Sequence, residues 1–157
     1  MTDPVGRSTI NWQFEPPWLE WVTRKDDRLE TFLADDVAAM PADLWSSTGL
    51  QHAERTLLQR FPGITADADT GDEVLTRFGC YLGEVFVRAL QGFWLNDPFP
   101  YASPRATVRF VYTDARIAVY DEVVLALHHR TGTRWSDLHT ALSGRCAAWW
   151  ESGHSSR

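Results

Sequence analysis

The stretch from residue 71 to residue 91 constrains the fold more than any other part of the chain, because it predicts a long helix that is apolar over most of its surface. Its apolar residues recur at helical spacing and form a wide face. Thr70 and Glu73 have the spacing of a capping box, and Gly92 suits the position just after a helix. Such a helix has to be covered on several sides, so we expect it at the centre of the domain.

Four further helices are predicted around this central one. Apolar residues at helical spacing predict them over residues 16–40, 43–61, 120–130 and 136–150. The polar stretch 24–27 leaves open whether the first of them is one helix or two. Thr48 and Gln51 have the spacing of a capping box for the second, and Ser136 is a candidate N-cap for the last.

Strand patterns lie between the third and the fourth predicted helix. The apolar run 93–95 and the alternating stretch 106–112 predict an antiparallel hairpin. Residues 117–119 are either a short third strand or the lead-in to the next helix. The predicted fold class is therefore α+β and mostly helical, with about five helices and a small antiparallel hairpin or three-stranded sheet between helices three and four.

A chain of 157 residues suits one folded domain. We expect an extended N-terminal arm over residues 1–15, a single globular domain over 16–151 and a disordered tail over 152–157. No apolar run approaches the ~20 residues that cross a bilayer, and the first residues lack the apolar core of a signal peptide. The sequence thus predicts a cytoplasmic protein without a membrane partner.

The chain is acidic, with a net charge of -6 and a single lysine, Lys25. Binding of nucleic acid or of an anionic membrane needs clustered cations, which this sequence lacks, so we expect neither kind of partner. The acidic residues either keep the chain soluble or form an acidic face that binds a basic partner. The residues that would supply such a face are Asp26, Asp27, Asp35, Asp36 and Asp43.

Eight tryptophans are a large number for a chain of this length. Tryptophan side chains mostly serve in cores, but exposed ones are enriched in protein interfaces. The candidates for contact with a partner protein lie toward the two ends of the chain: Trp12, Trp18, Trp21, Trp149 and Trp150. A homodimer that buries these ends is also compatible with the pattern.

The sequence holds no recognisable catalytic motif. Cys80 and Cys146 fall in predicted helices and are predicted to be buried thiols, because a disulfide would need two helices that face each other at these positions. His128 and His129 are adjacent on a helix, where their side chains point in different directions, so they predict no shared metal site. We therefore expect neither a metal ion nor another cofactor.

Glu84 and Arg88 form the most specific polar pair in the sequence. They lie four residues apart within the apolar pattern of the central helix, in the orientation of an ion pair. The pair either fixes the packing of this helix or supplies a catalytic carboxylate, Glu84. In the second case a ligand pocket would lie between the helix and the hairpin, lined by Tyr81, Trp94, Phe110 and Tyr112.

The stretch FGCYLGEVFVRALQGFWLN (78–96) resembles a pattern that recurs in small uncharacterised bacterial proteins, a YxGExxxR helix followed by a glycine and an aromatic strand. The helix that precedes this pattern corresponds here to GLQHAERTLLQRFP (49–62). The turn that follows it corresponds to HHRTG (128–132). The resemblance covers about residues 44–150 and leaves out residues 1–40. Some proteins with this layout look like immunity proteins of bacterial toxin systems, so the resemblance implies a partner protein and transfers no catalytic residue.

These features favour a non-enzymatic cytoplasmic protein that binds another protein, as an immunity or accessory factor. The alternative is an enzyme or binding protein for a small, largely apolar molecule, held between the central helix and the hairpin. A deep pocket that reaches Glu84 would support this alternative, and a solid core at that place would argue against it.

Overall fold

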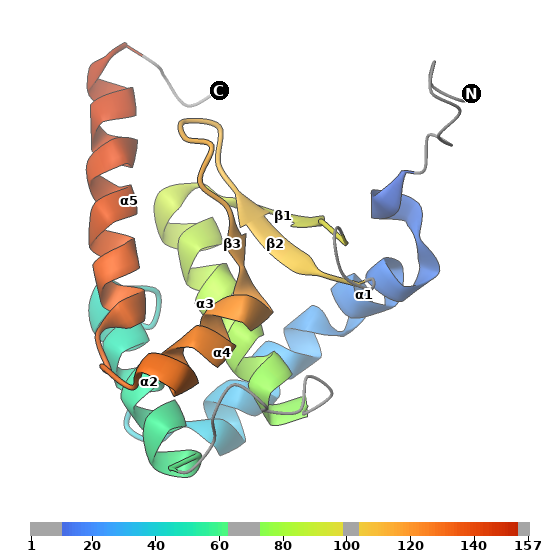
Figure 1. Ribbon diagram of the computed structural model, residues 1–157, viewed down its shortest axis with the longest axis vertical. Helices are drawn as coiled ribbons and strands as arrows, with labels where there is room; N and C mark the ends of the chain where they lie inside the picture. Colours follow the sequence, from blue (N-terminus) through green and yellow to red (C-terminus); the bar gives the residue numbers. More distant parts are fainter. Residues whose placement is uncertain (1–10, 63–72, 99–103, 154–157) are drawn as a thin grey trace.

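The computed structural model describes residues 11–62, 73–98 and 104–153. In these residues the chain forms five α-helices and a three-stranded antiparallel sheet, which is the helix-rich α+β fold that the sequence predicts (Figure 1). In chain order the elements are η1 (Trp12–Phe14), α1 (Pro16–Thr31), η2 (Phe32–Asp36), α2 (Ser47–Arg60), α3 (Glu73–Leu90), β1 (Phe93–Asn96), β2 (Ala106–Arg109), β3 (Ile117–Ala118), α4 (Val119–His129) and α5 (Arg134–Glu151). None of the described helices is both long and apolar enough to cross a membrane.

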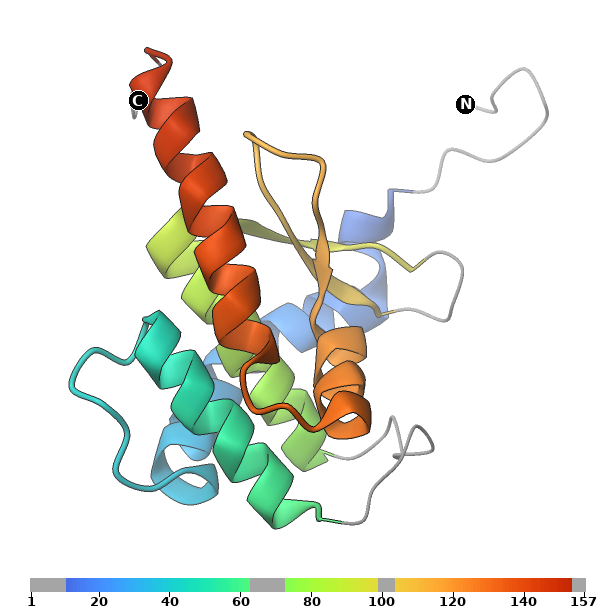
Figure 2. The ribbon, with the colours of Figure 1, turned by 60° about the vertical axis from the view of Figure 1, so that its left-hand side comes forward.

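Helix α3 lies at the centre of the domain, as its wide apolar face predicts. All its residues from Phe78 to Phe86 are buried. The other four helices and the sheet contact it, and Figure 2 shows α5 running across the domain in front of it. Because its neighbours cover several sides of α3, its apolar residues leave water together, which is the main stabilising contribution to the fold.

Helix α1 continues without a break through the polar stretch 24–27. It ends at Thr31, so the prediction of a helix as far as residue 40 is wrong. The following residues form η2, a wider π-helical turn that ends at Asp36. Val37 is then extended, which stops the helical hydrogen bonding at this point.

The predicted capping box of α2 is also wrong. Its N-cap is Ser46, whose hydroxyl accepts a hydrogen bond from the backbone N–H of Gly49 at 3.1 Å. Thr48 lies inside the first turn instead of before it. Ser, Thr, Asp and Asn are interchangeable as caps, so neighbouring candidates such as Ser46 and Thr48 are hard to tell apart from spacing alone.

The first turn of α5 is capped from another helix. The carboxylate of Glu54, on α2, accepts hydrogen bonds from the backbone N–H groups of Trp135 at 2.7 Å and Arg134 at 3.2 Å. Burial raises the pKa of Glu54, and these backbone hydrogen bonds oppose the rise. Helix α5 therefore begins before Ser136, the N-cap predicted from local sequence.

The predicted hairpin is confirmed, because β1 pairs antiparallel with β2 in the register Phe93↔Arg109. Strand β3 pairs with the other side of β2 and leads directly into α4 at Val119. The indole of Trp94, on β1, lies against Gly83 of α3, where a Cβ atom would come within 2.0 Å of the ring. Only a glycine lets the sheet approach the central helix this closely.

Cys80 on α3 and Cys146 on α5 are buried free thiols, as predicted. Burial raises the pKa of Cys80 to about 12, so this thiol stays protonated at neutral pH. A protonated, buried thiol is a poor nucleophile, and Cys80 acts here as a small apolar side chain of the core.

His139 of α5 lies on the side of that helix that packs on α3, with its ring centroid 5.9 Å from that of Phe86. Its Nδ1 is 3.3 Å from the hydroxyl oxygen of Ser143. Its Nε2 is buried and has no hydrogen-bond partner among the residues that the structure describes. Burial in these surroundings lowers the pKa of His139, because the charged imidazolium would lose its hydration there.

The free energy of unfolding is therefore expected to fall between pH 7 and pH 5 in a way that depends on His139. The unfolded chain, with an ordinary pKa near 6.5, binds the proton more tightly than the folded chain, so stability is lost as the pH drops below that value. Urea unfolding at pH 7 and at pH 5 should show that the free energy of unfolding falls less in His139→Gln than in wild type. The exposed His128 provides a control, since His128→Gln should keep the wild-type loss. Equal losses in all three proteins would show that His139 does not contribute.

Candidate functional site

Glu84 lies where α1, α3 and β1 meet. Its Oε2 accepts hydrogen bonds from Nε1 of Trp94 at 2.9 Å and from Nζ of Lys25 at 3.1 Å. Its Oε1 accepts a hydrogen bond from Nε of Arg88 at 3.1 Å, so the predicted Glu84–Arg88 ion pair is present as part of a larger network. The guanidinium of Arg88 also lies 4.0 Å from the ring centroid of Trp45, in a cation–π contact.

The donors around Glu84 determine its charge. Burial alone would raise the pKa of Glu84, but the hydrogen bonds from Trp94 and Arg88 and the positive charge of Lys25 outweigh burial and lower it. Glu84 is therefore ionised at neutral pH, and donors hold both of its oxygens. A general acid or base needs an oxygen that can exchange a proton with a substrate. Of the two roles that the sequence left open for Glu84, the geometry favours the structural one.

Two of the tryptophans predicted to contact a partner lie in the core. Trp18 and Trp21 stack with their ring centroids 5.1 Å apart, and Trp21 packs on Trp94 at 5.0 Å. Trp18 is 4% and Trp21 is 9% exposed, so they present little surface to a partner. Trp12, on η1, is exposed.

The predicted contact residues of the C-terminal end are half-buried. Trp149 packs on Tyr112 with ring centroids 6.1 Å apart, and Trp150 lies edge-on to Trp149 at 5.0 Å. Their helix, α5, ends on the side of the domain away from α1 (Figure 1). The two predicted groups of tryptophans therefore lie in separate parts of the fold, and the first is mostly buried.

The residues predicted to line a ligand pocket pack against other groups of the fold. Tyr81 and Tyr112 each donate a hydrogen bond to a backbone carbonyl, and burial raises the pKa of both hydroxyls. Phe110 lies 5.4 Å from Tyr112, measured between ring centroids, and Trp94 covers Gly83. Trp94 and Phe110 occupy the region between α3 and the sheet in which the pocket was expected. Tyr81 lies on another side of α3, where its ring stacks on that of Phe32 with centroids 4.7 Å apart.

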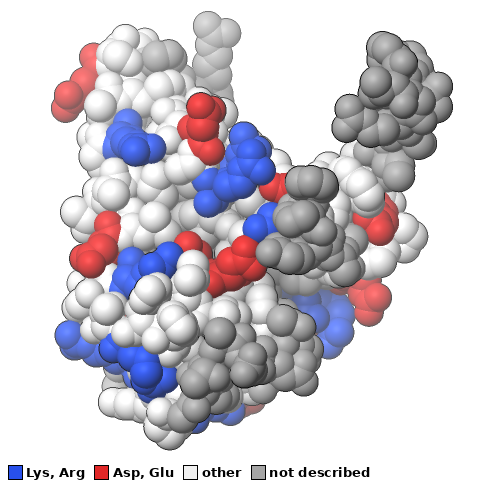
Figure 3. Space-filling model, viewed as in Figure 1, with Lys and Arg blue, Asp and Glu red and all other residues white. Residues whose placement is uncertain are grey.

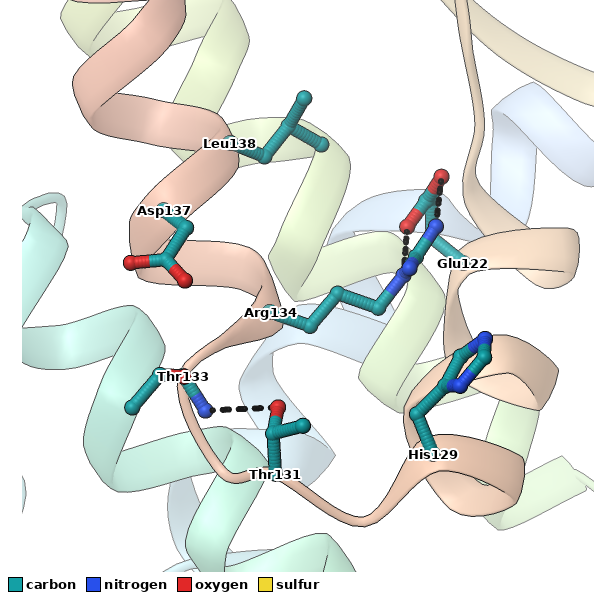
Figure 4. Close-up of a pocket in the computed structure, with 7 residues that line it drawn as sticks. All are labelled: Glu122, His129, Thr131, Thr133, Arg134, Asp137 and Leu138. Atoms are coloured by element: carbon teal, nitrogen blue, oxygen red, sulfur yellow. Dashed lines mark hydrogen bonds and ion pairs between the residues drawn. The ribbon is translucent and has the colours of Figure 1, made fainter.

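A depression of about 520 Å³ lies instead at the turn between α4 and α5 (Figure 4). Its charged or titratable lining residues are Glu122, His129, Arg134 and Asp137. Figure 4 shows Arg134 facing Glu122, with Nε and Oε2 2.8 Å apart, whereas Asp137 points away from this pair. Arg134 and Glu122 neutralise each other, so this pair gives the depression no excess charge. Within the described ranges, no three His, Cys, Asp or Glu side chains are placed to hold a metal ion.

The solvent-facing side of α1 combines carboxylates with two apolar side chains. Leu19 and Val22 lie about one helical turn apart and are 46% and 43% exposed. The exposed acidic residues of α1 and of the segment after it are Glu20, Asp26, Asp27, Glu30, Asp35 and Asp43. We call these eight residues the acidic face.

The cations of α1 turn toward α3, where they pair with acidic residues. Nζ of Lys25 lies 3.1 Å from Glu84, and Nε of Arg28 lies 3.0 Å from Glu73. Arg24 lies 3.9 Å from Glu73. Lys25 and Arg28 are thus neutralised on the inner side of the helix, whereas Arg24 is 52% exposed.

The carboxylates of the acidic face have little compensation. Asp26 lies 3.9 Å from Lys25, whose shorter contact is with Glu84. The other five form no ion pair with any described residue: Glu20, Asp27, Glu30, Asp35 and Asp43. On the face drawn in Figure 3, patches of both signs lie side by side over α4, α5 and the sheet, and blue atoms also lie beside red ones at the right, over α1.

Asp36 does not belong to this face, which corrects the prediction from the sequence. Its side chain is 1% exposed and accepts hydrogen bonds from Arg77 at 2.6 and 3.0 Å and from Arg60 at 3.0 Å. Asp35, the preceding residue, is exposed. Adjacent helical residues point about 100° apart, so one of a pair can be buried while the other faces solvent.

The prediction from the sequence missed four members of the acidic face: Leu19, Glu20, Val22 and Glu30. Their spacing contains the missing signal, because Glu20 lies seven residues before Asp27, and Glu30 lies four residues after Asp26. These spacings place side chains on the same side of a helix. Using this signal requires knowing that the opposite side, with Trp18 and Trp21, is the buried one.

Comparisons of the chain with models of protein families, with curated proteins and with solved structures found no match.

Proposed function

We propose that the chain is a protein-binding domain that binds a basic partner protein through the acidic face. The observation that carries this proposal is the separation of charge across α1. Lys25 and Arg28 pair inward with Glu84 and Glu73, whereas five of the six exposed carboxylates of the acidic face form no ion pair with any described residue. An uncompensated negative surface attracts a positive one, which speeds association and excludes acidic partners.

The apolar side chains within the acidic face support a protein partner rather than a small cation. Protein interfaces commonly have an apolar centre that charged and polar residues surround. Leu19 and Val22 supply such a centre, and Glu20 and Asp26 lie beside them on the same helix. A partner that fits this face would present Lys and Arg side chains around an apolar patch of its own.

The buried carboxylates also favour binding over catalysis. Asp36, Glu54 and Glu84 each accept at least two hydrogen bonds within the fold, and these bonds occupy both of their oxygens. We place the domain in the cytoplasm as part of this proposal. An immunity or accessory role, which the resemblance of residues 78–96 implies, is a form that such binding would take.

Reversal of charge in the acidic face is expected to weaken partner binding about tenfold or more, because like charges then face each other across the interface. The variant carries Asp27→Lys and Glu30→Lys, both at exposed positions without ion pairs to described residues. A partner captured with the wild-type chain is purified and titrated calorimetrically against each protein at low and at high salt. Wild type should lose affinity as salt rises, and the variant should lose less.

The matched control carries Asp114→Lys and Glu151→Lys. Both residues are exposed, and they belong to the β2–β3 connection and to the end of α5, which Figure 1 shows away from α1. The two control substitutions change the net charge by the same amount as the two in the acidic face. The control should bind like wild type, and circular dichroism should show that both variants are folded. Equal weakening in the two variants would mean that net charge governs binding, and wild-type binding by both would remove the acidic face as the interface.

A further inference from the structure

The outer edge of β1 carries backbone groups that point away from the sheet. The strand order is β1-β2-β3, so β1 has β2 on one side only. The backbone N–H of Asp97 donates to the carbonyl of Arg105 on the β2 side at 3.0 Å. Alternate residues of a strand direct their backbone groups to opposite sides, so those of Trp94 and Asn96 point outward. Such groups are a template for pairing with another strand.

A side chain of η1 occupies this edge at Asn96. The Oε1 of Gln13 accepts a hydrogen bond from the backbone N–H of Asn96 at 2.9 Å, and its Nε2 donates one to the Asn96 carbonyl at 2.9 Å. The side-chain amide of Asn96 donates to the carbonyl of Trp12 at 3.1 Å. The Gln13 amide thus forms the two hydrogen bonds that a residue on a neighbouring strand would form.

These contacts attach η1 to β1. The rings of Trp12 and Phe14 are exposed, so they contribute little to its attachment. Asn96, by contrast, is buried. Residues 84 positions apart are therefore joined mainly through the amide groups of Gln13 and Asn96 and the Trp12 carbonyl.

We infer that η1 is a strap that closes the outer edge of β1 and prevents a second copy of this chain from pairing there. With the strap in place, Trp94 is the one residue of β1 whose outward backbone groups are not held by Gln13. Phe93 lies next to it and is exposed, so a released edge would present an apolar side chain beside unpaired backbone groups. If the β1 strands of two copies paired antiparallel, the outward backbone groups of each strand would form hydrogen bonds with those of the other. By symmetry, both chains would make the same contacts.

Hydrogen exchange at the Asn96 amide tests the closure of the edge. Gln13→Ala removes both hydrogen bonds to the Asn96 backbone, so this amide is expected to exchange about tenfold faster or more than in wild type, as measured residue by residue by NMR. Gln59→Ala, at an exposed position of α2, is the matched control and should keep the wild-type rate. An Asn96 rate that is the same in Gln13→Ala and Gln59→Ala would overturn the inference.

Sedimentation velocity over a range of concentrations tests what the closed edge prevents. Gln13→Ala is expected to self-associate more strongly than wild type and Gln59→Ala. Rapid exchange at Asn96 without stronger self-association would overturn the guarding role of the strap.

Gln13→Glu is a milder variant in case Gln13→Ala unfolds. Its carboxylate still accepts from the Asn96 N–H but cannot donate to the Asn96 carbonyl. Its Asn96 exchange rate should lie between those of wild type and Gln13→Ala, or above that of wild type if Gln13→Ala cannot be measured. A rate equal to that of wild type would contradict the bidentate contact.

Discussion

Asp36→Ala is expected to lower the free energy of unfolding by about 3 to 5 kcal/mol. The side chain of Asp36 is 1% exposed and accepts hydrogen bonds from Arg77 and Arg60. Its removal leaves the guanidinium of Arg77, which is 15% exposed, without its carboxylate in a place where water replaces that partner poorly. The change also releases η2 from α2 and α3, because the two arginines belong to these helices.

Asp35→Ala is the matched control for this prediction. Asp35 is the preceding residue, is exposed and forms no ion pair with a described residue. Its replacement is expected to change the free energy of unfolding by no more than about 0.5 kcal/mol. Urea unfolding at pH 7, followed by circular dichroism, measures both. A similarly small change for Asp36→Ala would mean that packing of Phe32, and not the ion pairs, holds η2 in place.

Gly83→Ala is expected to lower the free energy of unfolding by about 2 kcal/mol. The new Cβ would lie 2.0 Å from one atom of the Trp94 ring and within 2.8 Å of two more, so the indole has to move. That movement strains or breaks the hydrogen bond from Trp94 to Glu84 and the contact of the ring with Trp21. Overpacking of this kind costs about 1–3 kcal/mol or more, and the better helix propensity of alanine recovers up to about 1 kcal/mol.

Gly144→Ala is the same substitution in a helix where the added methyl group has room. Apart from its own helix backbone, no atom of the described residues lies within 4 Å of the position that a Cβ would take at Gly144 on α5, so the change should stabilise the protein by about 0.5–1 kcal/mol. The two substitutions should thus have opposite signs in thermal or urea unfolding. In addition, tryptophan fluorescence should change in Gly83→Ala and stay as in wild type in Gly144→Ala. Stabilisation by both substitutions would show that the sheet does not rest on Gly83.

The elements with a long apolar repeat were predictable from the sequence. The apolar spacing of α3 and the alternation in β2 report directly which side of each element is buried. The ends of the elements were harder to predict. Helix α5 begins at Arg134 with a cap from Glu54, which belongs to a different helix, and no local pattern contains that information.

The candidate site was predictable only where its residues are close in the chain. Glu84 and Arg88 are four residues apart on one helix, so their ion pair follows from helix geometry. Lys25 and Trp94 complete the same network from α1 and β1, and nothing in the sequence pairs them with Glu84. For the same reason the sequence did not separate Asp36, which has two arginine partners, from the exposed acidic residues.

The sequence by itself determined the helix-rich α+β class, the central position of α3 and the net negative charge of the chain. Only the tertiary structure decided where that charge is exposed. A buried charge is costly unless it is paired, so Lys25 and Arg28 can turn inward only because α3 places Glu84 and Glu73 opposite them. Of the exposed carboxylates of α1, only Asp26 lies within 4 Å of a cation of the described residues, and their excess on one side of the helix is therefore a property of the packed fold.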